Sequence, residues 1–290
     1  MQFRKIQWFV LLAMLVHLVN SLIQGLFVES FFVQVYLGQS ILLLLGLWFL
    51  IKNRKNILDY AKLQMPPWWS FLVVIPVVLA TLMISSFVTA LSMLLTRSIG
   101  LIDIPPQEFT LMTTNNLLLV LTFSLLPGIV EEFFCRGVLL PAYEESVSTK
   151  QAIIYSSLMF GLMHFNVWNV LSPMVLGIVF SLLTIRFESI IPSMFGHALF
   201  NLLVLGVQKM ELSEDMIAAQ NDITWSQLIG LIPTAAIAVL FLGWLFWRIG
   251  VREHFQPAKK KLSSWDYIPV VITLVLFIGI SFLIQKGLGL

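Results

Sequence analysis

Long apolar runs recur along the whole chain, separated by short polar segments, and they constrain its fold more than any other feature. A bilayer core about 30 Å thick takes roughly 20 apolar residues in a helix to cross it. By this length criterion the sequence predicts nine spans, at 6–26, 32–51, 70–95, 112–140, 151–166, 170–186, 189–206, 226–247 and 267–285. The expected fold class is therefore all-α, a polytopic transmembrane helix bundle of about eight or nine spans.

One of these spans fits the length criterion poorly. Residues 151–166 would rise only about 24 Å as a helix, so this segment must tilt, lie off-centre or border a locally thinned membrane. The count of eight or nine spans depends on whether this segment crosses the membrane.

Composition supports a membrane protein and excludes other classes. The 290 residues are 59% hydrophobic, against ~45–50% in a soluble domain, and only 11% are charged. A net charge of +2 is too small to indicate a nucleic-acid partner. The lone cysteine, Cys135, cannot form an internal disulfide. With no separate polar segment long enough to fold, residues 1–290 are expected to form a single membrane domain whose partner is the lipid bilayer.

The distribution of Lys and Arg predicts the orientation of the chain in the membrane. With the N-terminus in the cytoplasm, most basic residues fall in inner segments, as the positive-inside rule requires. The predicted inner set is Arg4, Lys5, Lys52, Arg54, Lys55, Lys62, Lys150, Arg186, Arg248, Arg252, Lys259, Lys260 and Lys261, and the outer set is Arg97, Lys209 and Lys286. The compact loops favour a bacterial plasma membrane as the location.

Ionisable residues inside the predicted spans are the candidates for a functional site, because they are costly to bury at membrane depth. They are His17, Glu131, Glu132, Arg136, His164 and His197. All except His17 belong to three short patterns, "EEFFCR" (131–136), "FGLMH" (160–164) and "HALFN" (197–201). His17 has no comparable neighbour and is expected to be structural or interfacial.

Helical spacing separates the two carboxylates of the first pattern. Glu132 and Arg136 are four residues apart and share a face, which predicts an ion pair, whereas Glu131 points about 100° away. A structural ion pair beside a carboxylate that reaches a water-filled cavity would also explain the pattern. His197 and Asn201 also share one helical face, although both residue types commonly hydrogen-bond between membrane helices.

A carboxylate, two imidazoles and a carboxamide in a largely dry site suit peptide-bond hydrolysis. A carboxylate takes a proton from water, a histidine orients that water, and a second histidine with an amide stabilises the developing oxyanion. The set Glu131, His164 and His197 also has the ligand types of a catalytic zinc site, so the sequence leaves a divalent metal cofactor such as Zn open. The chain has no H-E-x-x-H pattern, no close Cys–His pair and no G-x-S-x-G elbow.

Together the three patterns resemble the motifs of the CPBP (Abi) family of intramembrane CAAX prenyl proteases and bacteriocin-processing enzymes. "EEFFCRG" resembles the Glu-Glu-x-x-x-Arg motif of that family, "FGLMH" its Phe-x-x-x-His motif and "HALFN" its His-x-x-x-Asn motif. The resemblance implies an intramembrane endopeptidase with its catalytic site between the central helices. The catalytic core would be residues 112–206, flanked by the helices of 1–111 and 207–290.

The resemblance also implies a role for each motif residue. Glu131 would activate water with His164 as its partner, and His197 with Asn201 would bind the oxyanion. Glu132 and Arg136 would be a supporting pair, and Phe160 would pack beside His164. The substrates implied are apolar or lipid-modified proteins and peptides, such as prenylated CAAX proteins, peptide pheromones or bacteriocin precursors.

Two non-proteolytic alternatives remain at this stage. The chain could be a membrane scaffold or immunity partner of a signalling protein, or a secondary transporter, although the sequence shows no internal symmetry of the kind many transporters have. Counting about 1.5 Å per residue from the inner ends of the spans puts Glu131 and His197 roughly 14 and 13 Å deep. This predicts a site that opens toward the cytoplasmic leaflet.

Overall fold

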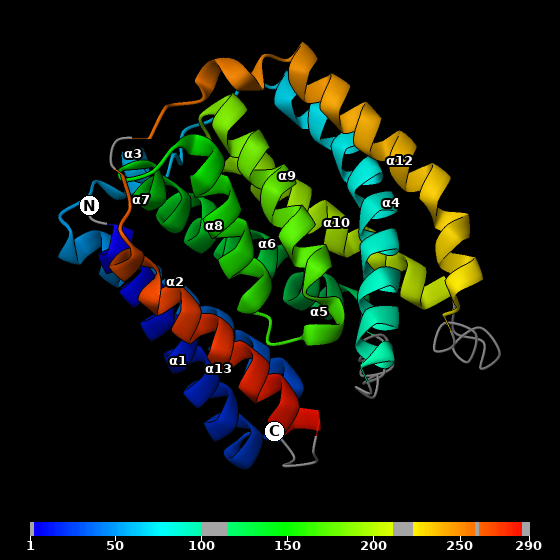
Figure 1. Cartoon of the computed structure of the whole chain (residues 1–290), viewed down its shortest axis with the longest axis horizontal. Helices are drawn as coiled ribbons and strands as arrows, with labels where there is room; N and C mark the ends of the chain where they lie inside the picture. Colours follow the sequence, from blue (N-terminus) through cyan, green and yellow to red (C-terminus); the bar gives the residue numbers. More distant parts are fainter. Residues whose placement is uncertain (1–2, 100–114, 211–222, 259–260, 286–290) are drawn as a thin grey trace.

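The structure is a computed structural model that describes residues 3–99, 115–210, 223–258 and 261–285, and its regular elements there are all helices (Figure 1). Seven helices are long and apolar enough to cross a membrane. They are α1 (Phe3–Phe27), α2 (Phe31–Lys52), α4 (Trp69–Ser98), the composite helix Asn116–Glu144, α10 (Ile191–Met210), α12 (Trp225–Arg248) and α13 (Ile268–Gln285). The predicted polytopic helix bundle is confirmed.

The predicted number of spans was too high. Segments 151–166 and 170–186 form α8 (Thr149–Leu162) and α9 (Leu171–Phe187), of 14 and 17 residues. An α-helix of 14 residues rises only about 21 Å, which is shorter than a bilayer core. The chain leaves α8 through a turn in which Phe165 has a positive φ of 48°, and a short 3₁₀ turn, Val167–Asn169, leads into α9.

The composite helix Asn116–Glu144 contains two π-helical segments, η2 (Leu121–Leu125) and η3 (Phe133–Leu139), between α5 (Asn116–Val120), α6 (Leu126–Glu132) and α7 (Leu140–Glu144). Pro127 and Pro141 each lie just after a π-helical segment. Since proline has no N–H and its ring clashes with the carbonyl four residues back, a wider turn before it accommodates the ring. The π-helical segment η3 begins directly after Glu132.

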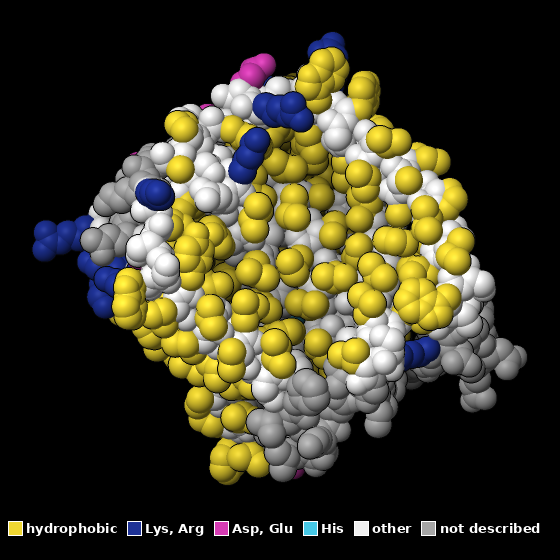
Figure 2. Space-filling view, in the orientation of Figure 1, with side chains coloured by type: hydrophobic (Ala, Val, Ile, Leu, Met, Phe, Trp, Pro, Cys, Tyr) yellow, Lys and Arg dark blue, Asp and Glu magenta, His cyan; other side chains and the backbone are white. Residues whose placement is uncertain are grey.

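Contacts between segments far apart in the sequence define two ends of the bundle. At the end that we call the basic end, Lys55 Nζ donates to Glu145 Oε1 at 2.6 Å. At the other, which we call the far end, Arg97 Nη1 donates to the Ile223 carbonyl at 3.3 Å. On the face shown in Figure 2, most Lys and Arg side chains lie along the basic end, and the surface between the ends is largely apolar. On this face the Lys and Arg side chains are therefore concentrated at one end of the bundle (Figure 2).

Close packing of α6 against α10 brings the first and last sequence patterns together. A Cβ added at Gly128 would lie 2.9 Å from the backbone nitrogen of Ala198, so only glycine fits there without a shift. Ser124 Oγ donates to the Ala198 carbonyl at 2.6 Å and fixes the same contact. These contacts set Glu131 and Glu132 opposite His197.

Candidate active site

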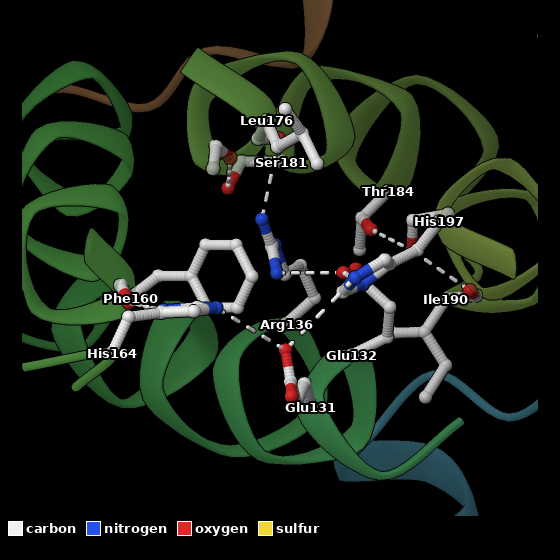
Figure 3. A network of polar contacts seen from close by, with 12 residues as sticks. Glu131, Glu132, Arg136, Phe160, His164, Leu176, Ser181, Thr184, Ile190 and His197 are labelled. Carbon is white, nitrogen blue, oxygen red and sulfur yellow. Dashed lines mark hydrogen bonds and ion pairs between the residues drawn. The ribbon is translucent and has the colours of Figure 1, made fainter. Parts of the chain in front are cut away.

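Except for Asn201, the predicted site residues come from four elements and meet in one network of contacts (Figure 3). Glu131 and Glu132 end α6, Arg136 lies in η3, Phe160 lies in α8 with His164 just beyond its end, and His197 lies in α10. In Figure 3, Glu131 lies below and between the two imidazoles, with Arg136 and Glu132 drawn above it.

Glu132 and Arg136 form the buried part of the network. Their side chains are 0% and 1% exposed, and Arg136 Nη1 donates to Glu132 Oε1 at 2.7 Å. This is the ion pair that the spacing predicts. The guanidinium also lies 4.5 Å from the centre of the Phe160 ring, a cation–π contact, and donates to the Leu176 carbonyl at 3.3 Å.

The same Glu132 oxygen orients His197. His197 Nδ1 lies 2.9 Å from Glu132 Oε1, so this nitrogen donates to the carboxylate and the opposite nitrogen, Nε2, points at Glu131. Phe180 stacks on the imidazole at a centroid distance of 5.6 Å. The hydrogen bond to Glu132 at the ring edge and the stacking of Phe180 on the ring face together hold the His197 imidazole in a single orientation.

Glu131 has one anchored oxygen and one that faces the imidazoles. Its Oε1 accepts a hydrogen bond from Gln39 Nε2 of α2 at 2.8 Å. Its Oε2 lies 3.9 Å from His164 Nε2 and 3.9 Å from His197 Nε2. These separations exceed a direct hydrogen bond but suit one bridging water.

The tautomer of neutral His164 follows from its other contact. His164 Nδ1 lies 2.8 Å from the Phe160 carbonyl, which can only accept, so Nδ1 carries the proton. In the neutral ring, Nε2 then presents a lone pair toward Glu131. The Phe160 ring meets the imidazole edge-on at 4.9 Å, so Phe160 lies beside His164 as the resemblance implies.

Asn201 makes no hydrogen bond to the network among the described residues, but it lines the same space. It borders a cavity of about 330 Å³ together with Glu131, His164 and His197. Four residues after His197 on α10, it faces the cavity from the same side of the helix. An oxygen atom in that cavity could therefore be reached by both side chains.

A second cavity, of about 620 Å³, lies on the other side of Glu131 and His164. The two cavities share five of their lining residues, which are Phe123, Pro127, Glu131, Phe160 and His164. We call this 620 Å³ space the α1–α2 cavity, because most of its wall comes from the second half of α1 and the first half of α2, with Ile280 of α13. The carboxylate of Glu131 thus lies where two cavities adjoin.

The direction of the two cavities corrects one prediction. The α1–α2 cavity follows α1 toward Leu26 and α2 back to Phe31, and the other follows α10 to Gln208, so both extend toward the far end. The sequence predicted an opening toward the cytoplasmic leaflet, which is the side of the basic end in the predicted orientation. That estimate assumed straight spans with ends set by hydropathy, whereas free volume depends on how the side chains of several helices pack.

Two polar residues of the α1–α2 cavity were missed or set aside by sequence reasoning. Gln39 contacts Glu131 across 92 positions of sequence and belongs to no motif. His17 was expected to be structural or interfacial, but it lines this cavity together with Glu131 and His164. The only sequence signal for either was a polar residue within an apolar span.

Glu131, His164 and His197 are the residues that the sequence left open as ligands of a divalent metal. Within the described part of the chain, no group of three or more His, Cys, Asp or Glu side chains is arranged to hold a metal ion. His197 Nδ1 is committed to Glu132 and Glu131 Oε1 to Gln39, which leaves Glu131 Oε2 and two imidazole nitrogens separated by 3.9 Å from it.

A protein-family model matches the segment that holds the three sequence patterns. Residues 113–203 match the family model described as Rce1-like, type II CAAX prenyl endopeptidase Rce1-like. No curated protein and no solved structure matches the chain. The matched segment contains the three sequence patterns and ends two residues after Asn201.

Proposed function

We propose that this chain, whose residues 113–203 belong to the Rce1-like type II CAAX prenyl endopeptidase family, cleaves peptide bonds of apolar or lipid-modified proteins and peptides inside the membrane. That family consists of peptide-bond hydrolases. The observation that carries the proposal is the position of Glu131 Oε2, 3.9 Å from Nε2 of both His164 and His197 where two cavities adjoin.

In the proposed reaction Glu131 is the general base. A water between Glu131 Oε2 and His164 Nε2 would donate one proton to each, which aims its oxygen lone pair at the scissile carbonyl carbon. As the C–O bond forms, the proton on the Glu131 side passes to the carboxylate. Glu131 later returns that proton to the leaving amine as the C–N bond breaks.

The carbonyl oxygen gains negative charge as the water attacks, and His197 and Asn201 are the proposed donors to it. His197 Nδ1 already donates to Glu132, so donation from Nε2 requires a doubly protonated ring, whose charge the nearby carboxylates offset. With that ring charged, the formal charges of Glu131, Glu132, Arg136 and His197 sum to zero. Removing one such donor typically costs about 10²–10³ in kcat.

Substrate access is proposed from the far end, along the α1–α2 cavity. Its walls are mostly apolar, and Leu22, Leu26 and Val35 contribute to them, which suits an apolar or lipid-modified segment. If the N-terminus is cytoplasmic, as the basic residues predict, this end faces the outer leaflet.

The experiment is a cleavage assay on purified protein with a panel of isoprenylated, acylated and leader-type peptides, read by mass spectrometry. Glu131→Gln should reduce cleavage by at least about 10²-fold, since the general base is lost. Glu145→Gln, a carboxylate at the basic end, is the matched control and should cleave like the wild type. Wild-type rates in Glu131→Gln would refute the mechanism. Failure of the wild type on the whole panel would favour the non-catalytic scaffold.

A further inference from the structure

Two residues that line the α1–α2 cavity each have a buried side-chain polar atom without a hydrogen-bond partner among the described residues. These atoms are Gln39 Oε1 of α2 and His17 Nδ1 of α1. Both residues line the cavity that also contains Glu131 and His164, and both lie outside the segment that matches the protease family. Buried polar atoms are rarely left unpaired, so each one needs an explanation.

The amide of Gln39 is oriented by Glu131. Because Nε2 donates to Glu131 Oε1 at 2.8 Å, the opposite amide atom, Oε1, must be the acceptor that remains without a partner. An amide oxygen only accepts, so whatever satisfies it must be a donor. The hydrocarbon of a lipid chain cannot supply one, whereas the N–H groups of a peptide can.

His17 is held at the same cavity by its neighbours. Its ring stacks on Phe165 with an interplanar angle of 10°, and a Cβ placed on Gly38 would lie 3.5 Å from His17 Cε1. The imidazole therefore lies against α2 at Gly38, next to Gln39 in sequence, at a distance that is ordinary van der Waals contact. An imidazole can donate or accept, so it can pair with either polar group of a peptide unit.

We propose that Gln39 and His17 form a polar subsite for the main chain of the peptide substrate beside the scissile bond, with Gln39 Oε1 accepting from a substrate N–H. The proposal rests on the proposed endopeptidase function. It gives Gln39 two roles, as a positioning residue for Glu131 and as a binding residue for the substrate. An extended substrate in an otherwise apolar cavity would thereby have its backbone polar groups paired.

The test uses substrates in which single amide N–H groups are replaced by ester oxygens, at each peptide bond flanking the scissile one. In the wild type, one such replacement should lower kcat/KM about tenfold, because it removes the donor to Gln39. In Gln39→Leu the same replacement should have no effect, since the acceptor is already gone. Gln34→Leu, on the same helix but outside the cavity lining, is the matched control and should keep the tenfold loss.

The outcomes separate this subsite from the proposed function. If the wild type cleaves but no ester position matters, or if the loss persists in Gln39→Leu, the subsite proposal is wrong while the endopeptidase function stands. If the wild type cleaves nothing, the function itself has failed.

A second variant keeps the proposal testable if Gln39→Leu gives no folded protein. His17→Phe preserves stacking on Phe165 and leaves the Gln39–Glu131 hydrogen bond in place. This variant should raise KM about tenfold and leave kcat within about twofold of the wild type. That pattern is expected when the lost interaction binds the substrate as strongly in the ground state as in the transition state. An unchanged KM would overturn the role of His17.

Discussion

Replacing Arg136 by Met removes the charge at the centre of the site while keeping much of the side-chain volume. Glu132, 0% exposed, would then be a buried carboxylate without its cation. Breaking a buried ion pair by removing one partner costs about 3–5 kcal/mol. The cation–π contact with Phe160 at 4.5 Å is lost at the same time, which places the effect toward the upper part of that range.

The chain contains its own probe for this measurement. Cys135 is its single cysteine, is 1% exposed and precedes Arg136, so a thiol-reactive fluorogenic dye reports when this segment opens on heating in detergent. By the scaling that holds for soluble domains, a loss of 3–5 kcal/mol corresponds to a Tm lower by roughly 6–20 °C.

The matched control is Lys55→Met at the basic end. The Lys55–Glu145 pair has nearly the same N–O distance, 2.6 Å, but its side chains are 28% and 25% exposed. Exposed pairs contribute about 0–1 kcal/mol, so its Tm should fall by less than about 4 °C. If the two variants lowered the Tm equally, or if Arg136→Met had the wild-type Tm, burial of the Glu132–Arg136 pair would not contribute the expected free energy of unfolding.

Three further outcomes are expected. His164→Ala should abolish cleavage yet leave the dye-monitored Tm within about 3 °C, because the imidazole is partly exposed to the cavities; a fully active variant would remove it from the mechanism. Gly128→Ala should lower the Tm because its Cβ would meet the α10 backbone at 2.9 Å, whereas Gly230→Ala, with nothing within 4 Å, should not. With Cys135 replaced by Ser, Glu29→Cys should be labelled by an impermeant thiol reagent on intact cells and Ser263→Cys should not; the reverse pattern would invert the orientation.

Local spacing predicted much of the site. The i,i+4 relation gave the Glu132–Arg136 ion pair, and the divergence of Glu131 from that face is what leaves its carboxylate facing the cavities. Spacing could not bring His164 and His197 to within 3.9 Å of one oxygen, because that depends on how α8 and α10 pack against α6. The family resemblance supplied that expectation.

Other features had no local signal. The hydrogen bond from Gln39 to Glu131 spans 92 positions, and a single glutamine in an apolar run does not indicate its partner. Hydropathy also could not fix where α8 stops, since apolar residues continue beyond Leu162 into a turn. The Gln39–Glu131 hydrogen bond and the end of α8 both depend on how helices pack against one another, which the hydrophobic period of the sequence does not encode.

The π-helical segment η3 makes the length of this stretch as constrained as its chemistry. Such a segment accommodates one residue more than the α-helix it interrupts, so a one-residue deletion between 133 and 139 would let the helix become regular. The residues beyond the deletion would keep nearly their present orientation, because the wider turn already absorbs the extra residue, so the change would fall on 133–139 themselves, next to Glu132. A single helical wheel drawn through residues 116–144 is therefore misleading, since it displaces every residue beyond η3 by about 100°.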